Sequence, residues 1–216
     1  MIGLILAGGK NLITVRDMTT NVLPNGLNMV ELAYRKLTEI GLTTYLSVEP
    51  LLPGDLPAYG DMQLIINQKG INATGPLLGL LSAHRKFPMD DIFVLACNMP
   101  FMKISCLYYL FDLWLQRISE INVYQKGGRA EPFCGIYSYD ALRQIARLVS
   151  DKQKSHSSLQ YFVQRLNTCY MHIPKEDEVA FLNIRTQNQL ELLCKTQMSN
   201  PDQLLRSNAA YLFQGI

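Results

Sequence analysis

Long hydrophobic runs, histidines and paired cysteine motifs are all scarce in this 216-residue chain. No apolar run approaches the roughly 18 residues that a transmembrane helix needs, so we expect no contact with membranes. The five cysteines are odd in number and form no C-x-x-C pair, and the three histidines are scattered along the chain. This pattern argues against a disulfide framework and against a zinc site. It favours buried thiols in a cytoplasmic protein.

The chain also has little excess charge of either sign, because 20 Lys and Arg residues face 18 Asp and Glu residues. A formal net charge of +2 is too small to indicate a nucleic-acid partner. The first basic residue, Lys10, follows the first apolar run instead of preceding it, unlike the arrangement of a secretory signal. The length and the ordinary globular composition predict a single domain over residues 1–216.

Short apolar runs alternate with helix-length amphipathic segments along the whole chain. The predicted strands are 2–6, 43–48, 62–66, 91–97, 119–125, 132–138 and 168–173. The predicted helices are 29–40, 75–86, 104–118, 139–149, 156–166, 186–197 and 201–213. Runs such as DIFVLAC are apolar on both faces, which is typical of strands covered by helices on both sides. The fold class is therefore predicted as α/β, a three-layer α/β/α sandwich with a mostly parallel sheet.

Ligands of such sheets bind beyond the carboxyl ends of the strands, and this rule selects three stretches. They are Ala7-Gly8-Gly9-Lys10, Asn67-Gln68-Lys69-Gly70 and Cys97-Asn98-Met99-Pro100. The first follows a buried strand and could hold phosphate. It matches neither the G-x-G-x-x-G dinucleotide motif nor the P-loop, so an ordinary turn at a strand end explains it at least as well.

Three further features have both a structural and a functional interpretation. Gly75 and Gly79 are four residues apart, so on a helix they share a face and allow either tight packing or the approach of a ligand. Asn98 follows a buried strand and either caps the turn or faces a ligand. Asn183 is expected at a strand end before a helix, where asparagine is a common cap.

Five motifs taken together resemble one family, the molybdenum cofactor guanylyltransferases. In chain order they are Leu6-Ala7-Gly8-Gly9, Gly75-Pro76-Leu77-Leu78-Gly79, Cys97-Asn98-Met99-Pro100, Pro132 to Tyr137, and Phe181 to Leu190. Each motif is modest, but the five occur in register over almost the whole chain. The resemblance implies a nucleotide-diphospho-sugar transferase fold and the transfer of GMP from GTP to molybdopterin, with Mg²⁺ as the metal.

The resemblance also implies roles for individual residues. The implied nucleotide-binding residues are Leu6, Ala7, Gly8, Gly9, Lys10 and Asn67. The implied molybdopterin-side residues are Gly75, Gly79, Asn183 and Arg185. Asn98 stands at the position of the metal-binding aspartate in the family motif C-D-x-P.

The chain departs from the family pattern in the loop that follows the first glycines. The family carries an R-M-G step and then D-K there, whereas this chain has Ile13-Thr14-Val15 and Met18-Thr19. Lys10 and Arg16 are then the candidate catalytic cations.

The C-D-x-P motif and the C-terminal motif are changed as well. Asn98 supplies an amide oxygen where Mg²⁺ prefers a carboxylate, so we expect a weakened metal site that an aspartate would strengthen. Loss of the carboxylate and of a loop lysine together should slow transfer on the order of 10³-fold or more. Arg185 replaces the second asparagine of the C-terminal motif and could hold a phosphate or a carboxylate.

The sequence therefore leaves three hypotheses. The first is a guanylyltransferase in which Lys10 and Arg16 hold the triphosphate. The second is a non-catalytic relative that binds nucleotide, molybdopterin or a partner, such as a molybdoenzyme or another protein of cofactor biosynthesis. The third is an interaction protein with a vestigial cleft, for which the aromatic stretch 107–111 is either an interface or part of the core. Base specificity and oligomeric state are left open.

Overall fold

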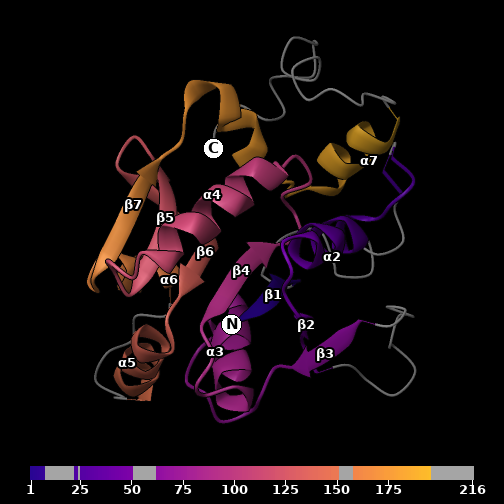
Figure 1. Cartoon of the computed structure of the whole chain (residues 1–216). Coiled ribbons are helices and arrows are strands. Elements are labelled where there is room, and N and C mark those ends of the chain that lie inside the picture. The colour runs from indigo at the N-terminus through magenta and orange to yellow at the C-terminus, as the bar shows by residue number, and fades with distance from the viewer. Residues whose placement is uncertain (8–21, 24, 51–61, 151–157, 196–216) are drawn as a thin grey trace.

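The computed structural model describes residues 1–7, 22–23, 25–50, 62–150 and 158–195 (Figure 1). The strands are β1 (Ile2–Leu6), β2 (Thr44–Val48), β3 (Gln63–Ile66), β4 (Ile92–Ala96), β5 (Ile121–Lys126), β6 (Arg129–Tyr137) and β7 (Thr168–His172). The helices are α2 (Met29–Glu39), α3 (Gly75–Lys86), α4 (Ile104–Leu115), α5 (Tyr139–Ser150), α6 (Leu159–Val163) and α7 (Gln187–Lys195), with the 3₁₀ helix η1 (Lys175–Phe181). The predicted helix 201–213 lies outside the described residues.

The strands form one sheet in the order β3-β2-β1-β4-β6-β5-β7. Strands β3, β2, β1 and β4 are parallel neighbours, as are β5 and β7. Strand β6 runs antiparallel to both of its neighbours, β4 and β5. The prediction of a mostly parallel sheet is confirmed, and β1, β2 and β4 are buried along their whole length as their continuous apolar sequences indicate.

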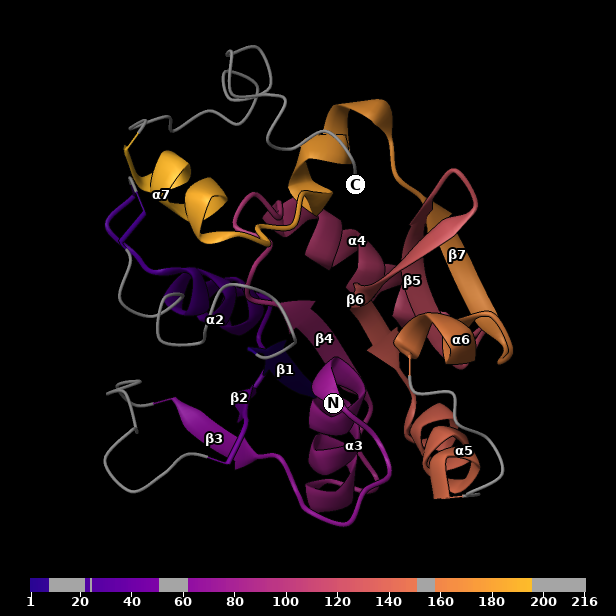
Figure 2. The same cartoon turned by 180° about the vertical axis from the view of Figure 1, so that it is seen from behind.

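Helices cover both faces of this sheet, so the three-layer prediction is confirmed. Helices α2 and α4 lie on one face, while α3, α5 and α6 lie on the other (Figure 2). Successive residues of β1 divide between the two cores, because side chains of a strand alternate between its faces. Ile5 joins the core under α2, and Leu4 and Leu6 join the core under α3.

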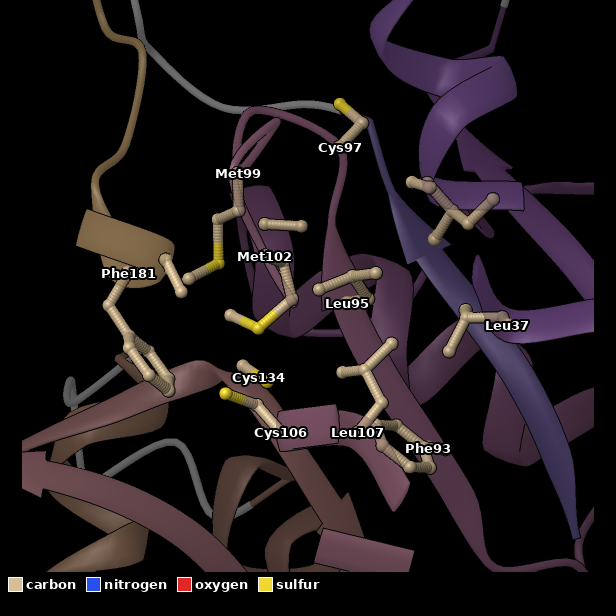
Figure 3. Close-up of a cluster of buried hydrophobic side chains, with 14 of the residues drawn as sticks. Leu37, Phe93, Leu95, Cys97, Met99, Met102, Cys106, Leu107, Cys134 and Phe181 are labelled. Carbon is tan, nitrogen blue, oxygen red and sulfur yellow. The ribbon is translucent and has the colours of Figure 1, made fainter. Parts of the chain in front are cut away.

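Sulfur-containing side chains gather in the core between the sheet, α4 and η1. Met99, Met102, Cys106 and Cys134 point toward one another, with Phe181 beside them (Figure 3). Burial raises the pKa of the Cys106 thiol to about 11. The expectation of buried thiols is confirmed for Cys97, Cys106 and Cys134, whereas Cys169 is half-buried. All four are free cysteines.

Helix α4 contains the aromatic stretch 107–111, which is partly buried in the core and partly exposed. Leu107 and Leu110 are buried, whereas Tyr108 and Tyr109 are exposed. The helix ends at Leu115, before its predicted end, and Arg117 then adopts a left-handed backbone with φ of 54°. Within the part of the chain that the structure describes, neither this helix nor any other is long and apolar enough to cross a membrane.

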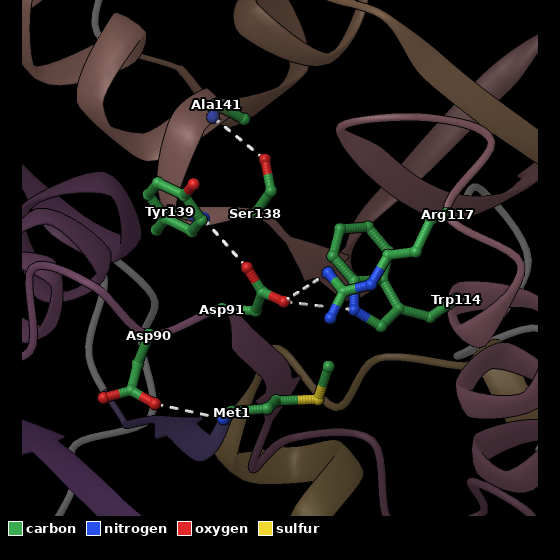
Figure 4. A network of polar contacts seen from close by, with 8 residues as sticks. All are labelled: Met1, Asp90, Asp91, Trp114, Arg117, Ser138, Tyr139 and Ala141. Atoms are coloured by element: carbon green, nitrogen blue, oxygen red, sulfur yellow. Dashed lines mark hydrogen bonds and ion pairs between the residues drawn. The ribbon is translucent and has the colours of Figure 1, made fainter.

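Asp91 joins three elements at the edge of the sheet where β4 begins. Its carboxylate accepts hydrogen bonds from Arg117 Nη1 at 2.7 Å, from Trp114 Nε1 at 3.3 Å and from the Tyr139 N–H at 3.1 Å (Figure 4). The buried carboxylate therefore ties the start of β4 to the end of α4 and the start of α5. The adjacent Asp90 forms a more exposed ion pair with the N-terminal ammonium group at 3.0 Å.

We predict that Asp91→Asn lowers the free energy of unfolding by about 2–3 kcal/mol, because the substitution removes the charge that Arg117 pairs with and leaves a buried polar network partly unsatisfied. Asp90→Asn is the matched control and should cost less than about 1 kcal/mol, as expected of an exposed ion pair. Urea denaturation of the three proteins makes the comparison. Equal costs for the two substitutions would contradict this account of Asp91.

Candidate functional site

The carboxyl ends of β1 and β4 meet at one edge of the sheet. The parallel ladder pairs Leu6 with Ala96 and continues with a hydrogen bond from the Cys97 N–H to the Leu6 carbonyl at 3.2 Å. Ala7 therefore lies beside Cys97 and close to Asn98, and all three are buried. The first residues of two of the three predicted strand-end stretches, Ala7 and Cys97, are thus brought together. Gly8, Gly9, Lys10 and Arg16 lie outside the described residues.

The third stretch begins with Asn67, which is anchored to the neighbouring strand. Its N–H donates to the Val48 carbonyl at 2.8 Å, and its Oδ1 accepts from Ser47 Oγ at 2.8 Å. The next residue, Gln68, donates its N–H to Ser82 Oγ of α3 at 2.9 Å. Because its side-chain oxygen already has a partner, Asn67 has a clear structural role, and its nucleotide-binding role stays a prediction.

Gly75 and Gly79 turn out to be glycines for different reasons. A Cβ at Gly79 would lie 2.4 Å from Ser47 Oγ and 3.2 Å from Leu6 Cδ2, so this position permits the close packing of α3 on β1 and β2. Among the described residues no atom lies within 4 Å of such a Cβ at Gly75, but its φ of +57° favours glycine. The expectation of tight packing is therefore right for Gly79 and does not hold for Gly75, and the approach of a ligand to either residue stays a prediction.

Asn98 pairs with Ile184, a residue 86 positions away in the sequence. The Ile184 N–H donates to the Asn98 backbone carbonyl at 2.8 Å, and Asn98 Nδ2 donates to the Ile184 carbonyl at 3.0 Å. Asn98 thus uses its side-chain amide to hold the segment 181–186 against the end of β4.

Asn183 lies in this segment, but it neither follows a strand nor caps a helix, so both parts of that expectation are wrong. It follows η1, and its Nδ2 donates to the Phe181 carbonyl at 3.2 Å. Thr186 and Gln189 form the cap of α7 instead. Thr186 Oγ1 accepts from the Gln189 N–H at 3.3 Å, and Gln189 Oε1 accepts from the Thr186 N–H at 3.1 Å. The spacing T-x-x-Q was the sequence signal for this capping box.

Arg185 and Glu131 bring opposite charges to the same region. Arg185 is exposed, and its N–H donates to Gln189 Oε1 at 2.7 Å. Glu131 lies on β6, opposite Tyr124 of β5. Burial raises the pKa of the Glu131 carboxyl, although Arg129, Arg185 and Lys126 lie near enough to oppose that shift. Sequence reasoning missed Glu131, which stands directly before the Pro132 that opens the fourth motif.

Lys36 is a second residue that sequence reasoning missed. It extends from α2, and its Nζ donates to the Pro100 carbonyl at 2.8 Å, two residues beyond Asn98. Burial lowers the pKa of Lys36 to about 8, and the Cys134 thiol opposes this shift. The sequence carries only a weak signal for Lys36. This lysine lies three residues after the buried Ala33, so the two share the buried side of an amphipathic helix.

Comparison with known proteins identifies the family. The sequence model of the MobA-like NTP transferase domain matches residues 3–168. The chain belongs to this family. A probable molybdenum cofactor guanylyltransferase of Geobacillus sp. (strain WCH70) is 25% identical over 196 residues, which cover 88% of this chain and 96% of that protein. A second, from Methanocaldococcus jannaschii, is 28% identical over 133 residues, covering 56% of this chain and 61% of that protein.

Solved structures confirm the fold of the MobA-like NTP transferase family. Molybdopterin-guanine dinucleotide biosynthesis protein A from Archaeoglobus fulgidus superposes with a TM-score of 0.69 at 20% identity, over 90% of this chain and 97% of that one. A cytidylyltransferase from Leptospira borgpetersenii superposes with a TM-score of 0.67 at 11% identity, over 100% of this chain and 96% of that one. At these identities the likeness concerns the fold alone.

The described residues of this MobA-like domain do not fit a carboxylate-held Mg²⁺ site. Mg²⁺ is usually bound through one or two carboxylates together with substrate phosphates. The strand-end stretches at 67–70 and 97–100 contain no carboxylate. Nowhere in the described ranges do three or more His, Cys, Asp or Glu residues form a group that could hold a metal.

We predict that Gly79→Ala lowers the free energy of unfolding by about 1–3 kcal/mol, because the added Cβ would overlap Ser47 Oγ. In a Ser47→Ala background the clashing oxygen is gone, so the same substitution should cost clearly less. Urea denaturation of the two single variants and the double variant measures the coupling. If the cost of Gly79→Ala is unchanged by Ser47→Ala, the close contact is not what requires glycine here.

The buried lysine predicts a pH dependence of stability. Lys36 has a pKa of about 8 in the folded protein and 10.5 in the unfolded chain, so between these values only the unfolded chain keeps the proton. The contribution of Lys36 to the free energy of unfolding should therefore rise with pH across this window, by at most about 3 kcal/mol, and level off above it.

Comparison with Lys36→Met isolates this effect. The stability of the wild type relative to Lys36→Met should increase from pH 8 to pH 10.5, measured by urea denaturation at each pH. Arg35→Met, at the exposed neighbouring position, is the control, and its difference from the wild type should stay constant. A flat profile for Lys36→Met would show that the folded protein does not depress the pKa of Lys36.

Proposed function

We propose that this protein transfers GMP from GTP to molybdopterin. The observation that carries the proposal is the junction of β1 and β4, where the strand-end stretch that begins at Ala7 meets the one that begins at Cys97. Membership of the MobA-like family and the names of the two relatives support the choice of substrates. In the reaction, a phosphate oxygen of molybdopterin attacks the α-phosphorus of GTP, and pyrophosphate leaves.

The triphosphate is proposed to lie against the backbone N–H groups of Gly8 to Asn11. Glycine lets the backbone approach a phosphate closely, and consecutive N–H groups form an anion-binding concavity. Lys10 and Arg16 would supply positive charge to offset the charge that develops on pyrophosphate. This assignment comes from the sequence, because these residues lie outside the described ranges.

Molybdopterin is proposed to bind on the side formed by the start of α3 and the segment 181–186. Asn183 and Gly79 support this side by a hydrogen bond and by packing within the protein, and Gly75 opens the helix there. Arg185 is the exposed cation of the segment and would contact an anionic group of the substrate.

A second candidate function is a non-catalytic relative that binds nucleotide or molybdopterin on behalf of a partner protein in the cytoplasm. The observation that favours it is the commitment of the Asn98 amide to the Ile184 carbonyl, at the position where the family pattern has a metal-binding aspartate. Under this proposal GTP binds but is not consumed.

Release of pyrophosphate from GTP in the presence of molybdopterin distinguishes the two functions. We predict transfer at a rate on the order of 10³-fold below that of a family member with the aspartate and the loop lysine, because the charge-stabilising groups are missing. Binding of GTP, ATP and CTP is measured in parallel, and GTP should bind most tightly.

Lys10→Gln should reduce both GTP affinity and transfer by about tenfold or more, as expected for loss of a charge-assisted contact to phosphate. Lys86→Gln removes the same charge at the last residue of α3 and should change neither. GTP binding without transfer would favour the non-catalytic relative. Absence of GTP binding would contradict both proposals.

A further inference from the structure

Asn98 forms two hydrogen bonds with Ile184, and one of them requires the amide group of the Asn98 side chain. The backbone carbonyl of Asn98 accepts from the Ile184 N–H at 2.8 Å, and the side-chain Nδ2 donates to the Ile184 carbonyl at 3.0 Å. Both residues are buried. An ionised aspartate has only acceptor oxygens, so it would place negative charge against the Ile184 carbonyl with no proton to share.

These two hydrogen bonds hold the segment 181–186, which further hydrogen bonds fix on both sides of Ile184. On one side, Asn183 Nδ2 donates to the Phe181 carbonyl at 3.2 Å. On the other, the Arg185 N–H donates to Gln189 Oε1 at 2.7 Å, where Gln189 belongs to the cap of α7. The backbone of Arg185 is therefore placed from two directions, by Asn98 through Ile184 and by Gln189.

The side chain of Arg185 remains open to a ligand. It is exposed and, among the described residues, has no ion pair within 4 Å and no side-chain hydrogen bond, although the Glu131 carboxyl lies near enough for Arg185 to oppose the rise of its pKa. Two cations elsewhere in the fold differ in this respect, since Lys103 pairs with Asp177 at 2.7 Å and Lys126 pairs with Glu178 at 3.0 Å. An arginine on a fixed backbone loses only side-chain freedom when it binds an anion, and its planar fork matches phosphate.

We propose that Asn98 is a positioning residue, which holds the segment 181–186 so that Arg185 binds a phosphate group at the carboxyl edge of the sheet. The inference rests on the proposed function only for the source of the phosphate, which is either the triphosphate of GTP or the phosphate of molybdopterin. Under this proposal the amide of Asn98 positions Arg185, whereas the aspartate of the family motif binds a metal ion. The expectation that Asn98→Asp strengthens Mg²⁺ binding is thereby reversed.

The first test is titration with inorganic pyrophosphate in the presence of EDTA. Arg185→Gln should weaken binding about tenfold to a hundredfold, the loss expected for a charge-assisted contact. Lys175→Gln removes the same charge from the exposed start of η1 and should stay within about twofold of the wild type. Failure of the wild type to bind pyrophosphate, or an unchanged affinity in Arg185→Gln, would overturn the proposal.

A double-mutant cycle tests whether Asn98 acts through Arg185. Asn98→Ala and Asn98→Asp should each weaken binding, and neither should weaken it further once Arg185→Gln is present. Asn98→Asp keeps the shape of the side chain but removes the donor and adds a negative charge, so Asn98→Ala is the cleaner variant and Asn98→Asp serves if the alanine variant does not fold. Additive losses would overturn the proposal, as would tighter pyrophosphate binding by Asn98→Asp when Mg²⁺ is added.

Hydrogen exchange reports the placement of the segment without any ligand. The N–H groups of Ile184 and Arg185 should exchange with solvent faster in Asn98→Asp than in the wild type, because the hydrogen bonds between residues 98 and 184 are weakened. Unchanged protection would overturn the positioning role. The transfer assay remains separate: transfer that is insensitive to Arg185→Gln refutes this inference alone, whereas coupled pyrophosphate binding without transfer refutes the proposed function alone.

Discussion

The parallel ladder between β1 and β4 runs in register from Ile2 and Ile92 to Leu6 and Ala96. One further hydrogen bond, from the Cys97 N–H to the Leu6 carbonyl, carries the pairing to the last residue before Asn98. Because both strands are buried on both faces, the helices on either side hold this register. Ala7 and Cys97, which are some 90 residues apart in sequence, therefore meet at one edge, and the candidate site depends on that meeting.

The polar residues at this edge act mainly on the protein itself. Asn67 is engaged by Ser47, Lys36 holds the Pro100 carbonyl, and Asn98 holds Ile184. Buried amides and hydroxyls of this kind avoid the cost of unsatisfied backbone groups where strands end. The amide of Asn98 fits this arrangement, since a donor is needed beside the Ile184 carbonyl.

The fold could be predicted from the sequence because its signals are local. Strand 2–6 and helix 75–86 were predicted with the bounds that the structure has, the first from its apolar run and the second from Gly75 and Pro76. Strand β6 begins three residues before its predicted start, because residues 129–131, which form no apolar run, pair with β5 in a hairpin. The 3₁₀ helix η1 has no clear sequence pattern and was not predicted. Asn183 follows this helix, so it lies neither at a strand end nor at a helix cap as predicted. The pairing of Asn98 with Ile184 is a tertiary contact, which no local pattern could have indicated.

A crystal structure with a non-hydrolysable GTP analogue and Mn²⁺ tests the central claim most directly, since manganese is located by its anomalous scattering. The account predicts the triphosphate at the edge where β1 and β4 end, Arg185 in contact with a phosphate of the bound nucleotide or facing the open molybdopterin side, and Asn98 still donating to the Ile184 carbonyl. Manganese coordinated by Asn98, or a nucleotide bound away from this edge, would contradict it.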